Sequence, residues 1–247
     1  MKKTLTVIAL LAMSLGAFAQ NTGKDILKEL EEKPLEEKAK KAKPEKEFKV
    51  FQMQALARLG YGWHLIDATE FQTGFHKGNA EFFMNITEAD FSPAKWLTLS
   101  VGMDVKWSHF TPKPEYGFSM VADDLALGAA PAGIDNNQSA LSTAAFTFPV
   151  GVTLRFGRFA SVSAGAEAVV NLPKNSRIND SYAIGSSKYQ VKTPAGPAIP
   201  GFAWNAFGRV TFGGLFGLYA RYYPRQIIPD VPFGCTTVGI IMDFTNF

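Results

Sequence analysis

Residues 96–108, WLTLSVGMDVKWS, alternate apolar and polar side chains along almost their whole length. The apolar positions run from Leu97 to Trp107, and the residues between them include Thr98, Asp104 and Lys106. A period of two predicts a β-strand, because successive side chains of a strand point to opposite faces. Residues 144–156, AAFTFPVGVTLRF, show the same pattern. Both segments are therefore expected to be strands with one apolar and one polar face.

Six further segments alternate in the same way with more irregularity: 50–64, 74–87, 161–172, 201–212, 215–223 and 236–247. The connections alternate in length, being short at 88–95, 157–160 and 213–214 and longer at 65–73, 109–140, 173–200 and 224–234. Short turns at one end and long loops at the other are typical of a membrane barrel. We therefore predict an all-β fold over residues 50–247, an eight-stranded antiparallel up-and-down transmembrane β-barrel. A hairpin near residues 182–191, which would extend the strands at 161–172 and 201–212, leaves ten strands as an alternative.

A soluble β-sandwich would also alternate apolar and polar residues. Two features favour the barrel: Phe, Trp and Leu are frequent on the apolar faces, and charges lie near the middle of the polar faces. Aromatic residues also cluster near the expected strand ends, as in the interfacial girdles of membrane barrels. These residues are Trp63, Trp96, Trp107, Phe156, Trp204, Phe212 and Tyr222.

The first 19 residues have the organisation of an export signal. Lys2 and Lys3 precede an apolar run at 5–15, and Ala17-Phe18-Ala19 is a small-x-small cleavage pattern. We expect cleavage after Ala19; the alternative, a membrane anchor, would need a longer apolar run. Residues 20–49 carry 9 Lys and 8 acidic residues. This composition predicts a solvated, partly helical periplasmic arm, which is either a linker or a docking arm for a periplasmic partner.

Composition excludes several classes of function. Residues 50–247 carry 14 Lys and Arg against 14 Asp and Glu, so they offer no basic excess for nucleic acid. Cys235 is the single cysteine, which excludes an intramolecular disulfide and a cysteine-rich metal site. No phosphate-binding glycine loop is present, and no two histidines have metal-ligand spacing. We therefore predict neither a cofactor nor a metal.

The alternation places nine charged residues on the inward faces of the predicted strands: Arg58, Glu81, Asp104, Lys106, Arg155, Glu167, Arg209, Arg221 and Asp243. An eight-stranded barrel has an interior just wide enough for side chains to fill. Buried charges persist when they are paired and hydrogen-bonded. Because the bases and acids nearly balance, we predict a salt-bridged, largely closed lumen. A narrow porin-like channel for small solutes is the alternative.

The export signal, the eight alternating segments and the final Phe247 resemble outer-membrane barrels of the OmpA/OmpX kind. The Ala17-Phe18-Ala19-Gln20 junction is similar to that of small Bacteroidetes outer-membrane proteins. The resemblance covers residues 50–247, and the arm at 20–49 departs from the plain pattern. It implies the outer membrane of a Gram-negative bacterium, contact with outer-membrane lipid, and a structural or interaction role in envelope integrity, adhesion or an envelope assembly. A protein partner would bind the extracellular loops 109–140 and 173–200 or the arm.

A lipid-modifying enzyme of the outer leaflet is the third possibility. It would need a serine or histidine pair near the long-loop end. Ser108 and His109 are neighbours on one strand, so their side chains point to opposite faces. A pair would require His64 or His76 to approach Ser108 across strands. No nucleophile motif is present, and we therefore expect no enzymatic activity.

Overall fold

The computed structural model describes residues 48–131, 135–157, 159–213, 215–224 and 234–244. The chain divides into a unit of residues 1–47 and a unit of residues 48–247, and the described residues belong to the second. The predicted signal peptide at 1–19 and nearly all of the predicted arm at 20–49 lie outside the described residues.

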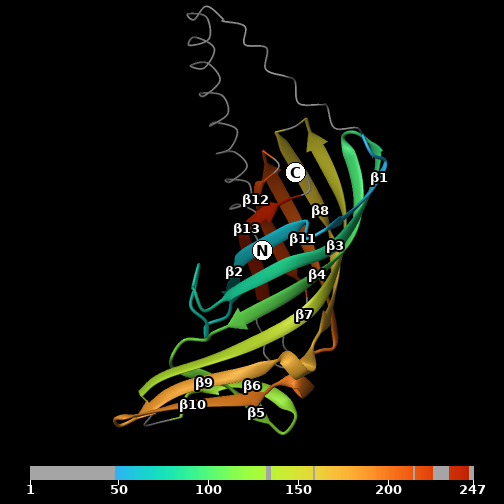
Figure 1. Cartoon of the computed structure of the whole chain (residues 1–247). Coiled ribbons are helices and arrows are strands. Elements are labelled where there is room, and N and C mark those ends of the chain that lie inside the picture. Colours follow the sequence, from blue (N-terminus) through green and yellow to red (C-terminus); the bar gives the residue numbers. More distant parts are fainter. Residues whose placement is uncertain (1–47, 132–134, 158, 214, 225–233, 245–247) are drawn as a thin grey trace, which may run out of the picture. The chain divides into compact units, whose positions relative to one another are not determined.

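Eight of the described strands form a closed antiparallel ring (Figure 1). In ring order they are β2 (Arg58–Asp67), β3 (Ala80–Ala94), β4 (Leu97–Phe110), β7 (Asp135–Phe156), β8 (Ala160–Asn171), β11 (Phe202–Phe212), β12 (Phe216–Tyr223) and β13 (Gly234–Asp243). The ring closes because β13 pairs with β2 along its whole length, from Gly234 opposite Asp67 to Asp243 opposite Arg58. The predicted eight-stranded antiparallel barrel is confirmed.

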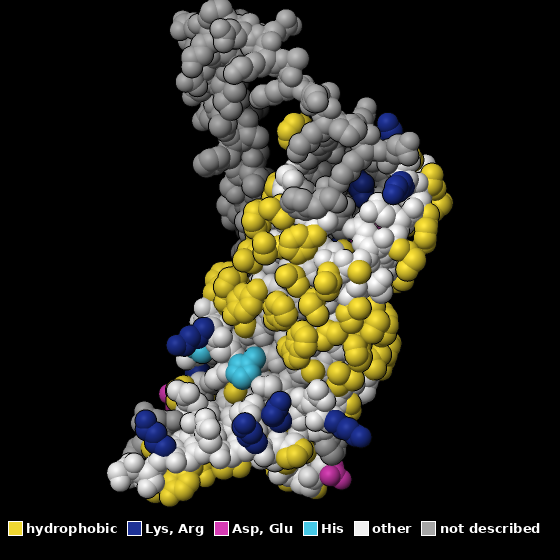
Figure 2. Space-filling view, in the orientation of Figure 1, with side chains coloured by type: hydrophobic (Ala, Val, Ile, Leu, Met, Phe, Trp, Pro, Cys, Tyr) yellow, Lys and Arg dark blue, Asp and Glu magenta, His cyan; other side chains and the backbone are white. Residues whose placement is uncertain are grey.

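Side-chain burial alternates along the strands as the barrel requires. On β4, Thr98, Asp104 and Lys106 are buried, whereas Leu99, Val101 and Trp107 are exposed on the outside. Figure 2 shows the hydrophobic side chains gathered into a broad band over the strands on one face of the molecule. A soluble sandwich would bury this apolar face between two sheets. The sandwich alternative is therefore wrong.

The two ends of the barrel differ as predicted. Short turns join β3 to β4, β7 to β8 and β11 to β12. Gly157 and Gly213 lie in two of these turns with φ values of 62° and 60°, a left-handed conformation that glycine adopts without steric cost. The long connections lie at the other end. Among the described residues, no helix has the length and apolar character needed to cross a membrane.

The predicted boundaries of the second strand are wrong. Residues 88–95 were expected to form a turn after a strand at 74–87, but β3 runs from Ala80 to Ala94. Its pairing with β4 contains a bulge between Asn85 and Thr87, which shifts the inward side chains from odd to even positions. Glu88 and Asp90 consequently face the interior and are buried.

The first strand is broken opposite this bulge. β1 (Phe51–Ala55) pairs with the far half of β3, and β2 continues from Arg58. Between them Leu56 has a φ of 51°, and its backbone N–H donates to the carbonyl of Ile86 at 3.2 Å. Ala57, which follows the break, is buried, and its N–H donates to the Asn85 side-chain oxygen at 3.2 Å.

Both large loops at the long-loop end contain hairpins. The first is formed by β5 (Tyr116–Val121) and β6 (Asp124–Ala129), and the second by β9 (Arg177–Ile184) and β10 (Ser187–Pro194). The second hairpin was expected to extend the strands now seen as β8 and β11, but β9 pairs with β7. The short 3-10 helices η1 (Pro173–Asn175) and η2 (Gly196–Ala198) separate it from β8 and β11. It does not enter the ring, so the ten-stranded alternative is wrong.

β7 is correspondingly longer than predicted. A strand was expected at 144–156, whereas β7 begins at Asp135 and has 22 residues. Its last part pairs with β4 and β8 in the barrel, and its first part pairs with β9 beyond the rim. The extended strand therefore joins the barrel wall and the second hairpin in one continuous sheet. Figure 1 shows this hairpin at the lower end of the picture.

Glycines on the inner face leave room for large side chains inside the narrow barrel. A Cβ atom at Gly60 would overlap the ring of Phe83, and one at Gly239 would overlap the Tyr61 backbone and the Tyr219 ring. Phe83 and Tyr219 are fully or almost fully buried and pack edge to face, with ring centroids 5.2 Å apart.

Gly239→Ala is expected to destabilise the folded barrel by about 1–3 kcal/mol, because the added methyl group overpacks the interior. Gly201→Ala is the matched control, since a Cβ atom there meets nothing within 4 Å. Urea unfolding of both variants in lipid vesicles measures the difference. Equal unfolding midpoints would contradict the packing described for the inner face.

Candidate functional site

Eight of the nine charged residues predicted to face inward are buried: Arg58, Glu81, Asp104, Lys106, Glu167, Arg209, Arg221 and Asp243. The ninth, Arg155, lies near the short-turn end of β7 and is half-buried. The buried charges form two groups, one in the middle of the barrel and one toward the short-turn end.

Arg221 of β12 is the centre of the first group. Its guanidinium forms ion pairs with Glu81 of β3 and with Glu167 of β8, the second with Nε 2.8 Å from Oε1. Lys106 of β4 approaches the same Glu167 oxygen at 3.7 Å, and Asn205 of β11 donates to it at 2.8 Å. Two cations and two carboxylates from four strands are thus joined across the lumen.

Aromatic side chains complete this group. The hydroxyls of Tyr219 and Tyr223 donate to the two carboxylate oxygens of Glu81 at 2.9 and 2.7 Å. The Arg221 guanidinium lies 4.5 Å from the ring centroid of Phe83, and Lys106 lies 5.1 Å from that of Tyr223. Glu81 therefore accepts from three side chains, and the cations have apolar faces on their remaining sides. This arrangement offsets part of the cost of removing the charges from water.

The second group lies around the break between β1 and β2. Arg58 forms an ion pair with Glu88, which the bulge in β3 turns inward. The Asn85 amide donates to Asp104 at 2.7 Å, and its oxygen accepts from the N–H of Ala57. Sequence reasoning missed Glu88, because the bulge that brings it inside leaves no mark in the alternation.

The long-loop mouth of the barrel is filled by an apolar cluster, defined as Ile66, Phe71, Phe110, Phe118, Leu125, Leu141, Ile178, Ala195, Ala198, Ile199 and Cys235. Some of these residues end the barrel strands, and the others come from all three long connections that are described. Just below, the His64 ring stacks on Phe110 at 4.5 Å and its Nδ1 lies 2.8 Å from the Thr237 hydroxyl.

Other apolar loop residues remain exposed on the second hairpin. Ile184, Tyr189 and Val191 are more than two-fifths exposed, and Tyr189 stacks on Tyr182 at 5.5 Å. β10 pairs only with β9, so one edge of this small sheet has no described strand beside it.

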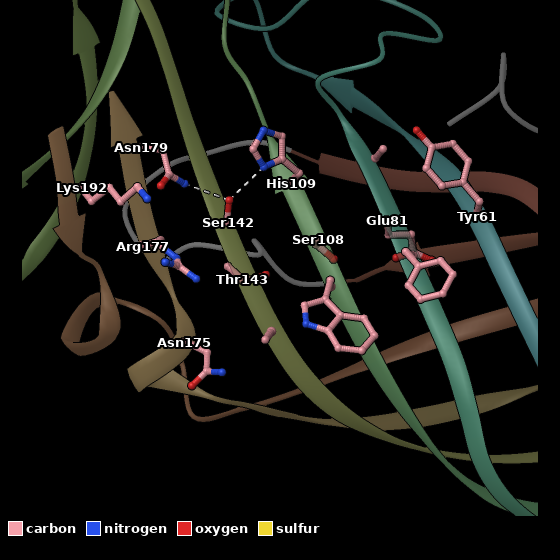
Figure 3. A pocket seen from close by; sticks show the side chains of 14 residues that line it. Tyr61, Glu81, Ser108, His109, Ser142, Thr143, Asn175, Arg177, Asn179 and Lys192 are labelled. Carbon is pink, nitrogen blue, oxygen red and sulfur yellow. Dashed lines mark hydrogen bonds between the residues drawn. The ribbon is translucent and has the colours of Figure 1, made fainter. Parts of the chain in front are cut away.

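The structure does not bring Ser108 to His64 or His76. Ser108 faces the interior, whereas His109 faces outward and its Nδ1 lies 2.9 Å from Oγ of Ser142 (Figure 3). The Asn179 amide donates to the same Ser142 oxygen at 3.1 Å. Sequence reasoning missed this cluster, because it depends on the register of β4, β7 and β9, which no single segment encodes.

His109, Ser142 and Asn179 lie in a groove of about 500 Å³, which is also lined by Tyr61, Phe82, Trp107, Arg177 and Lys192 and by the buried residues Glu81 and Ser108 (Figure 3). Four barrel strands line it: β2, β3 and β4 supply its aromatic side chains, and β4 and β7 also supply polar ones. The second hairpin adds Arg177, Asn179 and Lys192. No group of three or more His, Cys, Asp or Glu residues suited to a metal ion occurs in the described part of the chain.

No family model and no curated protein matches this sequence. Among solved structures, the chain is similar to Ail, the attachment invasion locus protein of Yersinia pestis, at 10% identity and a TM-score of 0.33. It is also similar to Ail in complex with the heparin analogue sucrose octasulfate, at 9% identity and 0.34. Both alignments cover 78% of this chain and 96% of the other. Values this low assign neither family nor function, and the barrel is established by its own strand pairing.

Arg221→Met is expected to destabilise the barrel by about 3–5 kcal/mol, because it leaves Glu81 and Glu167 buried with too little positive charge. Lys188→Met, which removes an exposed cation from β10, is expected to change stability by less than about 0.5 kcal/mol. Urea unfolding in lipid vesicles distinguishes the two.

The double variant Arg221→Met/Glu81→Gln gives a further control. Neutralising one of the stranded carboxylates is expected to restore part of the stability lost in Arg221→Met. A double variant as unstable as the sum of its two single variants would show that Arg221 and Glu81 do not interact inside the barrel.

Proposed function

We propose that this protein is a closed, non-conducting barrel of a bacterial outer membrane, with a structural or interaction role carried by its long-loop end. The membrane setting is supported by the outer apolar face. Large apolar side chains are exposed on every strand of the ring, for example Phe82, Val101, Val150 and Trp204. In water such a surface would drive aggregation, whereas in a bilayer it is solvated by lipid. The export-signal pattern at 1–19 agrees with this setting.

The buried charges and the apolar cluster inside the ring are the observations that support the proposal. From the short-turn end to the mouth lie the ion pair of Arg58 with Glu88, the network around Arg221, and the apolar cluster. A channel needs a continuous water path, and these layers occupy the bore in series. They favour the closed barrel over the narrow channel.

The interaction role is supported by the second hairpin. The free edge of β10 presents unpaired backbone groups, to which an extended segment of a partner can add as a further strand. Exposed Ile184, Tyr189 and Val191 provide apolar contact area beside it. This surface suits adhesion or assembly within the envelope.

A catalytic role has less support. A serine nucleophile needs a base that is itself oriented by a third group. No described carboxylate hydrogen-bonds to His109, and Asn179 contacts Ser142 rather than the histidine. We therefore propose that the barrel is not an enzyme.

The refolded mature protein is expected to give no conductance steps in a planar bilayer, because both the network and the mouth cluster block the bore. Replacing β5 and β6 by a short Gly-Ser linker is also expected to leave the bilayer silent, since the network around Arg221 still fills the lumen. A heat-dependent gel shift confirms folding in each case. Steady openings of the unaltered protein would favour the channel alternative.

Cysteine labelling in cells tests location and orientation. Ser186→Cys, at the tip of the second hairpin, is expected to react with a membrane-impermeant maleimide on intact cells. Lys95→Cys, in the short turn between β3 and β4, should react only after the outer membrane is permeabilised. Native Cys235 is 3% exposed and should stay unlabelled in both variants. Labelling of Lys95→Cys alone on intact cells would contradict the proposed orientation.

A further inference from the structure

The groove on the outer wall combines an aromatic side and a cationic side at the border of the apolar band. The aromatic side is a row across three neighbouring strands, in which Tyr61 pairs with Phe82 and Phe82 pairs with Trp107. Each of the three side chains is 40–43% exposed, and the Phe82 and Trp107 rings stack with centroids 5.7 Å apart. On the outside of a membrane barrel, such a row is positioned to contact lipid chains.

A polar row follows two residues farther along the strands. His109 of β4 pairs with Ser142 of β7, and Ser142 pairs with Arg177 of β9. The hydrogen bonds of Ser142 to His109 and Asn179 hold these three side chains together (Figure 3). The groove therefore has an apolar row and, two residues farther along the strands, a polar row. A lipid has the same order of parts, with apolar chains next to a polar headgroup.

The hairpin supplies positive charge to this groove. Arg177 and Lys192 both line it and both are exposed. The register of β9 and β10 places them on one face of the hairpin together with Asn179, opposite Lys192, and with Lys188, opposite Ala183. The acidic residue of β9, Asp180, is on the other face, so this face of β9 and β10 carries three cations and no carboxylate. Such a surface attracts an anion at the membrane border.

We propose that the groove binds the phosphate headgroup of an anionic lipid, with Arg177 and Lys192 on the phosphate and the lipid chains along Tyr61, Phe82 and Trp107. This inference rests on the proposed membrane setting. Arg offers a fork of donors that matches phosphate oxygens, and Lys adds a point charge. His109 and Asn179 lie beside the cations as further hydrogen-bonding groups. A free phosphate ion would use the cations but not the aromatic row, so the two sources of phosphate can be separated.

The test uses the refolded mature protein in a neutral detergent, with equal amounts of phosphatidylglycerol and phosphatidylcholine of the same chains. Native mass spectrometry then measures which lipid is retained. The unaltered protein is expected to retain phosphatidylglycerol preferentially. Arg177→Gln/Lys192→Gln is expected to weaken this retention about tenfold, as the loss of charge-assisted hydrogen bonds does. Lys188→Gln is the matched control, because Lys188 is on the same face of the hairpin but outside the groove. This variant should retain phosphatidylglycerol as well as the unaltered protein does.

Trp107→Ala separates a lipid from a free anion. It should also lower retention of phosphatidylglycerol, and inorganic phosphate alone should compete poorly. A gel shift on heating verifies that each variant is folded.

Four outcomes would overturn the proposal. They are equal retention of the two lipids, an equal loss in Lys188→Gln, full displacement by inorganic phosphate with no effect of Trp107→Ala, and release of a lysolipid that disappears in Ser142→Ala. The last would show that the groove is a reaction site rather than a binding site. Retention is measured independently of conductance, so a conducting barrel that still selects phosphatidylglycerol would overturn the closed lumen and leave this groove in place.

Discussion

The pairing of charges inside the ring of strands is the interaction on which the rest of the structure depends. Because the outer face of every strand is apolar, the charged side chains of the barrel strands are directed inward. Arg221 forms ion pairs with two carboxylates, Glu81 and Glu167, which belong to strands that do not neighbour its own strand in the ring. Backbone hydrogen bonds fix only adjacent strands, whereas these ion pairs connect strands that lie two and three positions apart in the ring. They therefore specify the cross-section of the barrel as well as close it.

The apolar cluster at the mouth of the barrel involves residues of the long connections. Phe71, Phe118 and Ile178 belong to the long connections, and their side chains pack against residues at the ends of the barrel strands. The connections therefore form part of the apolar cluster at the mouth. The outer surface of the second hairpin remains accessible, as does the edge of β10 that no described strand pairs with. In the proposed closed barrel, these surfaces offer sites for interaction, and the packing at the mouth disfavours transport through the barrel.

The sequence predicted the barrel because alternation within a strand is a local property, as in residues 96–108 and 144–156. It failed wherever the outcome depends on two strands at once. The bulge after Asn85 changes which residues of β3 face inward, from odd to even positions. The sequence pattern therefore predicted a turn at Glu88 and Asp90, although both are buried strand residues. The extension of β7 depends on pairing with β9, and the contact of His109 with Ser142 depends on the β4–β7 register. Inward charges could be predicted from parity, but their partners could not.

The same parity also marks where the apolar outer face ends. Along the outer face of β4, Leu99, Val101, Met103, Val105 and Trp107 are apolar, and the next outward residue is His109. Its neighbours across the sheet are Ser142 and then Arg177, so the change from apolar to polar occurs at one level on three strands. A hydrocarbon core would not tolerate these groups, whereas headgroups can satisfy them. In the proposed membrane setting, this row would lie at the border of the bilayer, with the cationic hairpin directly beyond it.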